Sequence, residues 1–172
     1  MTGPVGAGKS TLARLLSGAV VSTDDYLPDY ELVAEHERDE SAHLDWPLLT
    51  EHLGELGQGR TAAVPVWSFQ THRREGQRVV HPAEVVVLEG IHALHERVRE
   101  VLHVRVFVEA PAAVRWARWE HLERTGQRGW GVEKARAFFD GVAEPTFGRR
   151  EAAYRAAADI VVINDGSSIR AD

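Results

Sequence analysis

The first ten residues contain a glycine-rich motif that restricts what the chain can be. The run Gly3-Pro4-Val5-Gly6-Ala7-Gly8-Lys9-Ser10 fits the pattern G-x-x-x-x-G-K-[S/T] at every fixed position. Glycines let backbone N–H groups close around phosphate oxygens, and the helix that follows points its positive end at them. The lysine reaches the β and γ phosphates and the hydroxyl binds Mg²⁺. A glycine-rich turn that binds nothing is the alternative, but it would need neither Lys9 nor Ser10. We predict a phosphate-binding loop made of Gly3, Gly6, Ala7, Gly8, Lys9, Ser10 and Thr11.

Apolar runs alternate with stretches of helical period along the chain, which is typical of an α/β fold with a mainly parallel sheet. We predict strands at residues 19–22, 85–88, 104–108 and 160–163. We predict helices at about residues 9–17, 46–56, 112–124 and 132–157, the last broken near Pro145. Residues 61–67 and 77–80 read as a β-hairpin that projects from the sheet.

The start of the chain is unusual for this motif, because a phosphate-binding loop of this kind follows a buried strand. Only Met1 and Thr2 precede Gly3. No repeat or linker divides residues 1–172, so we expect one domain whose first strand is missing or truncated. We favour a start upstream of Met1 over the loss of a central strand.

Composition excludes several classes of function. The 172 residues contain 20 Lys+Arg and 26 Asp+Glu, so a formal charge of -6 argues against broad attraction to nucleic acid. The absence of cysteine excludes disulfides, thiolate zinc sites and cysteine nucleophiles. Without a signal peptide or a long apolar run, we expect a cytoplasmic protein that does not contact membranes. Self-association into a homo-oligomer stays open.

Carboxylates follow two of the predicted strands. Glu89 ends the apolar run at residues 85–88, where a P-loop enzyme needs a carboxylate to hold Mg²⁺ or its waters. Asp24 follows the strand at residues 19–22, at the edge where α/β sheets bind ligands. Asp24 is therefore a candidate base for a hydroxyl proton, and a candidate metal ligand together with Ser10 and Glu89. The alternatives are that Glu89 only ends a strand and that Asp24 caps the next segment.

The order of these elements resembles the uridine kinase group of the uridine kinase and phosphoribulokinase superfamily. The resemblance runs from Gly3 to about Ile163, and its most specific parts are the P-loop and residues 64–74, VPVWSFQTHRR. It implies a P-loop NTPase-type three-layer sandwich, with helices on both faces of the sheet, the hairpin and a helical lid. It also implies an ATP-dependent phosphotransferase with Mg²⁺, with GTP as the other donor, that acts on an alcohol group of a small molecule. The acceptor it implies is the 5′-hydroxyl of a pyrimidine nucleoside.

The resemblance also implies roles for individual residues. Asp24 matches the catalytic carboxylate, and Ser10 and Glu89 match the Mg²⁺ ligands. The predicted substrate-binding residues are Asp39 for the ribose, His72 and Trp67 for the base, and Arg74. Trp67 stands where the family has tyrosine, and Asp39-Glu40-Ser41 stands where it has Asp-His-Pro.

Arginines of the lid are expected to grip the phosphates in this family. Arg118 and Arg128 are our choices for catalysis beside Lys9, and the alternative is that each only solvates a helix face. Two other functions stay open at this point. One is a kinase of the same superfamily for another small alcohol or a sugar phosphate. The other is a P-loop protein that binds nucleotide without catalysis.

Overall fold

Two pairs of parallel strands form the centre of the fold, which a computed structural model describes for residues 1–166. In one pair, β1 (Ala19–Ser22) lies beside β4 (Val86–Glu89), and in the other, β5 (Val106–Glu109) lies beside β6 (Ile160–Ile163). Short β-branched runs suit strands of this kind. All four predicted strands are therefore present, with bounds shifted by one or two residues for β4 and β5. The predicted mixed α/β class with parallel pairing is confirmed.

Met1 and Thr2 lie between the two pairs, where the predicted first strand would belong. The Met1 amino nitrogen donates to the Leu88 carbonyl of β4 at 2.7 Å. On the other side, the Thr2 N–H donates to Val106 O at 2.8 Å, and Val108 N–H donates to Thr2 O at 2.7 Å. These two residues thus connect β4 to β5 at the end of the strands that carries the P-loop.

Helices begin close to where the sequence predicts. The helices are α1 (Lys9–Leu16), α2 (Trp46–Gly57), α3 (Glu96–Arg99), α4 (Ala112–Arg124), α5 (Val132–Phe138) and α6 (Glu144–Ala156). The predicted break near Pro145 is a π-helical turn, Phe139–Ala143, which sits just before that proline. The short helix α3 was not predicted, because its four residues are too few to show a period.

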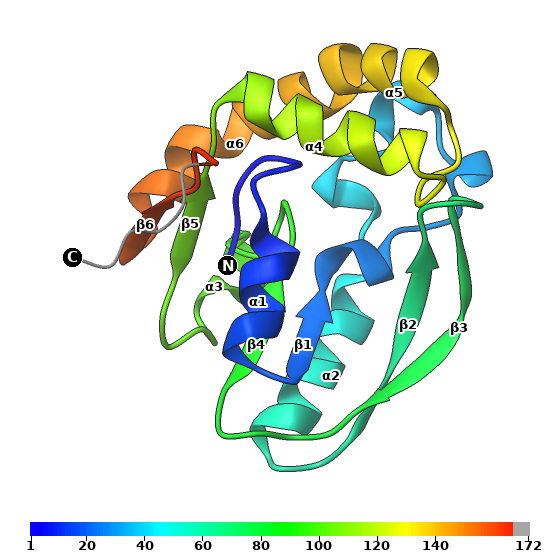
Figure 1. The fold of residues 1–172 in the computed structure, drawn as a ribbon. Helices are drawn as coiled ribbons and strands as arrows, with labels where there is room; N and C mark the ends of the chain where they lie inside the picture. Colours follow the sequence, from blue (N-terminus) through cyan, green and yellow to red (C-terminus); the bar gives the residue numbers. More distant parts are fainter. Residues whose placement is uncertain (167–172) are drawn as a thin grey trace.

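The predicted β-hairpin is present and stands apart from the parallel strands. Strand β2 (Ala62–Ser68) pairs antiparallel with β3 (Arg73–Val80), with a register shift between Pro65 and Trp67. β3 begins four residues earlier than predicted, because exposed polar residues hide its alternation. Figure 1 shows the hairpin on the far side of β1 from β5 and β6, with helix α4 running across the P-loop toward its tip. No helix among residues 1–166 is long and apolar enough to cross a bilayer.

A buried carboxylate, Glu123, helps to hold the loop between α4 and α5. Glu123 accepts hydrogen bonds from Trp119 Nε1 at 3.0 Å, from Trp130 N at 3.1 Å and from Gly131 N at 2.9 Å. Its side chain is buried beside the apolar cluster of Trp119, Phe138 and Phe139. The loop also docks on the hairpin turn, because Gly129 N–H donates to Phe69 O at 3.1 Å. The position of the loop therefore depends on Glu123.

Replacing Glu123 with alanine should destabilise the protein and loosen this loop. The substitution leaves a buried indole N–H and two backbone N–H groups without their charged acceptor, so we expect a loss of about 2–3 kcal/mol in the free energy of unfolding. Glu120→Ala on the same helix is the control, since among residues 1–166 Glu120 forms a single ion pair, with Arg124 at the surface. Urea denaturation measures both, and equal losses for the two variants would contradict the assignment.

Candidate active site

The P-loop closes around the entrance of a cleft of about 1500 Å³. Gly6, Gly8, Lys9, Ser10 and Thr11 line this cleft, whereas Gly3 and Ala7 of the same loop are buried. Gly8 has a φ of 95°, and a Cβ there would lie 2.4 Å from Asn164 Nδ2. Only glycine fits at that position, which explains why the motif requires it. The structure therefore assembles the predicted phosphate-binding residues at one site.

Lys9 points back over its own loop. Its ammonium donates to Pro4 O at 2.9 Å, and its side chain is buried. Burial lowers the pKa of Lys9, whereas Glu89 and Asp24 raise it. An ammonium held by one neutral carbonyl in a buried site gains from a nearby anion. This placement suits Lys9 to bind a phosphate group.

Ser10 and Glu89 meet in the cleft beside Lys9. The Ser10 hydroxyl donates to Glu89 Oε1 at 3.0 Å, which joins the start of α1 to the end of β4. Parallel pairing sets Ser22 of β1 opposite Glu89, so the segment after β1 leaves the sheet beside this carboxylate. A hydroxyl and one or two carboxylates, completed by substrate phosphates and water, are the usual protein ligands of Mg²⁺. The residues present thus fit a magnesium ion bound together with a nucleotide.

Asp24 lies two residues after the end of β1, in a 3-10 turn, Thr23–Tyr26. Its backbone N–H donates to Ser22 Oγ at 3.3 Å, which turns the chain so that the carboxyl lines the cleft. Burial raises the pKa of Asp24 to about 7, with smaller contributions from Glu89 and Asp39, and Lys9 opposes the shift. A carboxyl with a pKa near 7 can accept a proton at neutral pH.

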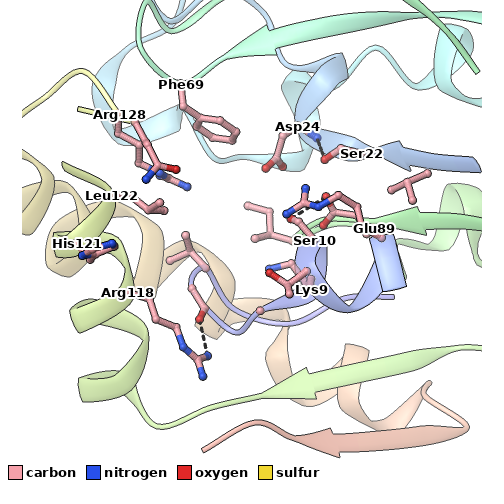
Figure 2. A pocket seen from close by; sticks show the side chains of 18 of the residues that line it. Lys9, Ser10, Ser22, Asp24, Phe69, Glu89, Arg118, His121, Leu122 and Arg128 are labelled. Atoms are coloured by element: carbon pink, nitrogen blue, oxygen red, sulfur yellow. Dashed lines mark hydrogen bonds between the residues drawn. The ribbon is translucent and has the colours of Figure 1, made fainter. Parts of the chain in front are cut away.

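Two arginines, Arg118 on α4 and Arg128 in the loop after it, line the side of the cleft across from Asp24, Ser10 and Glu89 (Figure 2). Arg118 on α4 donates to Gly6 O at 3.0 Å and to Asn164 Oδ1 at 3.0 Å. Asn164 in turn donates from Nδ2 to Ala7 O at 2.8 Å. Arg118 and Asn164 therefore brace the P-loop. Sequence reasoning missed Asn164, although its place after β6, at the carboxyl end of a strand, could have indicated it.

Arg128, in the loop after α4, lines the cleft with a guanidinium that stacks on two aromatic rings. Its guanidinium lies 4.4 Å from the ring centre of Phe69 and 4.5 Å from that of Trp119. Within residues 1–166 no carboxylate lies within ion-pair distance of it, and it lines the cleft. By contrast, Arg115 is bound to Glu144, and Arg124 pairs with Glu120 at the surface. Stacked and without an ion-pair partner, the Arg128 guanidinium is left with donors that can face an anion.

A second, smaller cavity of about 50 Å³ adjoins the cleft. Residues from the hairpin turn and from the α4–α5 region line it, and half of its lining residues are aromatic. The lining is Val5, Asp24, Leu27, Tyr30, Asp39, Phe69, His72, Ile91, Trp119, Arg128, Trp130 and Phe138. Asp24 and Arg128 line this cavity as well as the cleft. Val5, Phe69 and Ile91 line both as well, so a molecule in the small cavity would meet the cleft among these five side chains.

Asp39 and His72, two of the predicted substrate-binding residues, lie in this cavity. The Asp39 carboxylate accepts a hydrogen bond from the Tyr30 hydroxyl at 3.0 Å, and burial raises its pKa to about 6. The His72 ring stacks on Trp130, with ring centres 4.3 Å apart and an interplanar angle of 6°. Burial lowers the pKa of His72 to about 4, so the ring is neutral at pH 7. Sequence analysis missed Tyr30 and Trp130, because no pattern around either residue indicates that it packs near Asp39 or His72.

The other two predicted substrate-binding residues lie elsewhere. Trp67 is buried in the core against Tyr30, with ring centres 5.0 Å apart, and its Nε1 has no hydrogen-bond partner among residues 1–166. Arg74 donates to Leu27 O at 2.7 Å and to Tyr26 O at 2.6 Å, which fixes the hairpin to the segment after β1. Neither side chain is among those that line the cleft or the small cavity. In the described structure, Trp119 and Trp130 instead provide the indole rings of the cavity wall.

Asp39 should lower the stability of the folded protein at neutral pH. Its pKa is about 6 in the folded state and near 3.8 when unfolded, so the folded protein binds more protons between these values, and stability falls as pH rises through them. Asp39→Asn removes the charge, and we expect a gain of about 1–3 kcal/mol in the free energy of unfolding at pH 8 that disappears near pH 4. Urea denaturation at both pH values measures this, with Asp140→Asn, an exposed carboxylate, as the control. A gain that is the same at both pH values would contradict the explanation.

Comparison with known proteins identifies the family to which the chain belongs. Residues 29–148 match the model of the Phosphoribulokinase / Uridine kinase family. A uridine kinase of Deinococcus deserti is 37% identical over 143 residues, which cover 75% of this chain and 69% of that protein. A uridine kinase of Alkaliphilus metalliredigens is 35% identical over 129 residues, which cover 67% of this chain and 62% of that protein.

A solved structure shows the same fold at low sequence identity. The crystal structure of a candidate fructose transport system kinase from Silicibacter sp. TM1040 superposes with a TM-score of 0.71 and 20% identity, covering 93% of this chain and 86% of the other. The family match covers well over half of the chain, and the relative from Deinococcus deserti is aligned over more than two thirds of its length. The chain therefore belongs to the phosphoribulokinase and uridine kinase family, a family of kinases.

Proposed function

We propose that this protein transfers the γ-phosphate of ATP to the 5′-hydroxyl of a pyrimidine nucleoside, with GTP as the other possible donor and Mg²⁺ as the metal. The observation that carries the proposal is that Asp24 and Arg128 line both the P-loop cleft and the small aromatic cavity. A donor bound in the cleft and an acceptor bound in the cavity would meet between these side chains. Family membership and the relatives named uridine kinase support the acceptor class.

The residues on either side of this junction have distinct tasks in the proposal. Asp24 accepts the proton of the attacking hydroxyl. Lys9 and Arg128 stabilise the negative charge that spreads over the transferring phosphoryl group. Ser10 and Glu89 would hold Mg²⁺, which when bound neutralises charge on the β and γ phosphates. Arg118 keeps the P-loop in shape through its bond to Gly6 O.

The proposal includes the fold. The two parallel strand pairs and residues 1–2 together form one sheet of a three-layer P-loop kinase fold, and the α4–α5 region forms its lid.

The acceptor cavity must enlarge before a nucleoside can enter. Its volume of about 50 Å³ is little more than that of one or two water molecules. The contacts that close it are between the hairpin turn and the loop after α4, including the Gly129–Phe69 hydrogen bond and the stack of Trp130 on His72. Separation of these two segments would open it. The same small volume favours a second candidate function, a kinase of this family for an acceptor smaller than a nucleoside.

Mg-dependent release of ADP from ATP, measured with a panel of acceptors, tests the function. The panel contains uridine, cytidine, purine nucleosides, pantothenate, fructose and sugar phosphates, each assayed beside Lys9→Ala. We expect turnover with uridine or cytidine that is lost in Lys9→Ala. Turnover with another acceptor alone would support the second candidate, and ATP binding with no turnover across the panel would contradict a kinase acting on any of these acceptors.

Asp24→Asn should separate catalysis from nucleotide binding. Without the carboxylate we expect turnover to fall by about 10²- to 10⁴-fold, while the dissociation constant of Mg-ATP changes little. Asp25→Asn is the neighbouring control, because the Asp25 carboxylate is already occupied by Trp67 N–H and Arg78. Steady-state kinetics and titration calorimetry measure the two effects. Equal losses in turnover and in Mg-ATP affinity would contradict the role of Asp24 as the base.

A further inference from the structure

A buried histidine outside both cavities is bonded at each ring nitrogen. His92 follows β4 by three residues and is 1% exposed. Its Nε2 lies 2.7 Å from the backbone oxygen of Asp39, and its Nδ1 lies 3.1 Å from the Tyr154 hydroxyl on α6. These contacts join the strand that carries Glu89, the helix α6 and the segment that carries Asp39.

The partners of His92 fix which ring nitrogen carries the proton. The Asp39 carbonyl can only accept, so Nε2 must be the protonated nitrogen that donates to it. Nδ1 is then the acceptor, and the Tyr154 hydroxyl donates to it. Burial lowers the pKa of His92 to about 4, which keeps the ring neutral and the direction of this chain of bonds unchanged at pH 7.

The segment around Asp39 has little regular structure to hold it in place. It lies between two short 3-10 turns, Glu35–Glu37 and Ser41–His43. Side chains from other elements bind its backbone or side chains at consecutive residues. His92 donates to Asp39 O, Arg149 of α6 pairs with the Glu40 carboxylate, and Trp46 Nε1 donates to Ser41 O at 2.7 Å. Of these bonds, the one from His92 acts on the residue whose carboxylate faces the small cavity.

We propose that His92 is a positioning residue for acceptor binding, which holds the Asp39 carboxylate at the small cavity by donating from Nε2 to the Asp39 carbonyl. This inference rests on the proposed function, in which the small cavity binds the acceptor. The chain from Glu89 to His92 thereby contacts both sites. Glu89, at the end of β4, bonds to the P-loop, and His92, three residues later, holds the segment that carries Asp39. The distance between the donor and acceptor sites is then set by one short stretch of chain.

Substitutions at His92 should change acceptor binding without changing nucleotide binding. In His92→Leu the Asp39 carbonyl loses its donor, and we expect the acceptor KM to rise about tenfold, with kcat and the Mg-ATP KM within twofold of the original protein. In His92→Gln the side-chain amide can replace Nε2 as donor, so most of the acceptor affinity should return. Tyr154→Phe keeps the ring but removes the hydroxyl that fixes Nδ1 as acceptor, and should give an intermediate effect.

A second buried pair provides the matched control. His52 on α2 lies 2.8 Å from the Tyr26 hydroxyl and is buried to a similar extent, but it has no hydrogen bond to the acceptor segment. His52→Leu should lower the free energy of unfolding as His92→Leu does and leave the acceptor KM unchanged. A rise in acceptor KM that is equal in the two variants would show a general loss of stability and overturn the proposal.

A double-substitution cycle separates positioning from a purely structural role. If His92 acts through the Asp39 carboxylate, His92→Leu should raise the acceptor KM less than twofold when Asp39 is already alanine. An additional rise of the full tenfold in the Asp39→Ala background would contradict action through that carboxylate.

NMR provides a readout that does not depend on the identity of the acceptor. In the protein without substrate, long-range ¹H–¹⁵N correlations should show the proton of His92 on Nε2. The ¹³C resonance of the Asp39 carboxyl, assigned with Asp39→Asn, should shift in His92→Leu and not in His52→Leu. A proton on Nδ1, or an unmoved Asp39 resonance, would overturn the inference even if no acceptor were known. If the proton is on Nε2 and the Asp39 resonance shifts as expected, but no acceptor of the panel is turned over, the result counts against the proposed function alone.

Discussion

The parallel pairing of β1 with β4 determines where the chemistry can take place. Its register sets Ser22 opposite Glu89, so the chain leaves both strands at the same edge of the sheet and Asp24 and Glu89 emerge side by side. The P-loop reaches this edge because residues 1–2 lie between β4 and β5, and the Ser10–Glu89 hydrogen bond joins it to β4. The cleft and its junction with the small cavity are therefore formed at this edge of the sheet, and His92 lies three residues beyond it along the chain.

Charges are concentrated at this edge at a cost in stability. Burial raises the pKa of both Asp24 and Asp39 and lowers the pKa of both Lys9 and Arg128, so each group is held in surroundings that disfavour its charge. Bound phosphate and metal would supply the missing counter-charges. An acidic protein with a formal charge of -6 can thus bind an anionic nucleotide, because the attraction is local and comes from the loop, Lys9 and Arg128. Active sites commonly keep such strained electrostatics for function.

The sequence was sufficient for features whose signal is local. The P-loop pattern, the β-branched strands and the carboxylates that end β1 and β4 each depend on residues within a few positions of each other, and the structure brings Lys9, Ser10, Asp24 and Glu89 together. Features that depend on long-range packing were not accessible. Trp67 and Trp130 are both tryptophans near expected binding segments, but only the packing of the α4–α5 loop on the hairpin decides that Trp130 stacks on His72 while Trp67 is buried in the core. Arg74 likewise binds backbone carbonyls that no spacing rule identifies.

The central claim is that phosphate donor and acceptor meet at Asp24, between the cleft and the small cavity. A crystal structure with Mg²⁺, a non-hydrolysable ATP analogue and uridine tests it most directly. The account predicts the triphosphate along the P-loop and the uridine 5′-oxygen within about 3.2 Å of an Asp24 carboxylate oxygen, with the hairpin turn and the α4–α5 loop moved apart. Uridine bound with its 5′-oxygen beyond hydrogen-bond reach of Asp24, or found outside the cavity formed by Asp39 and His72, would contradict it.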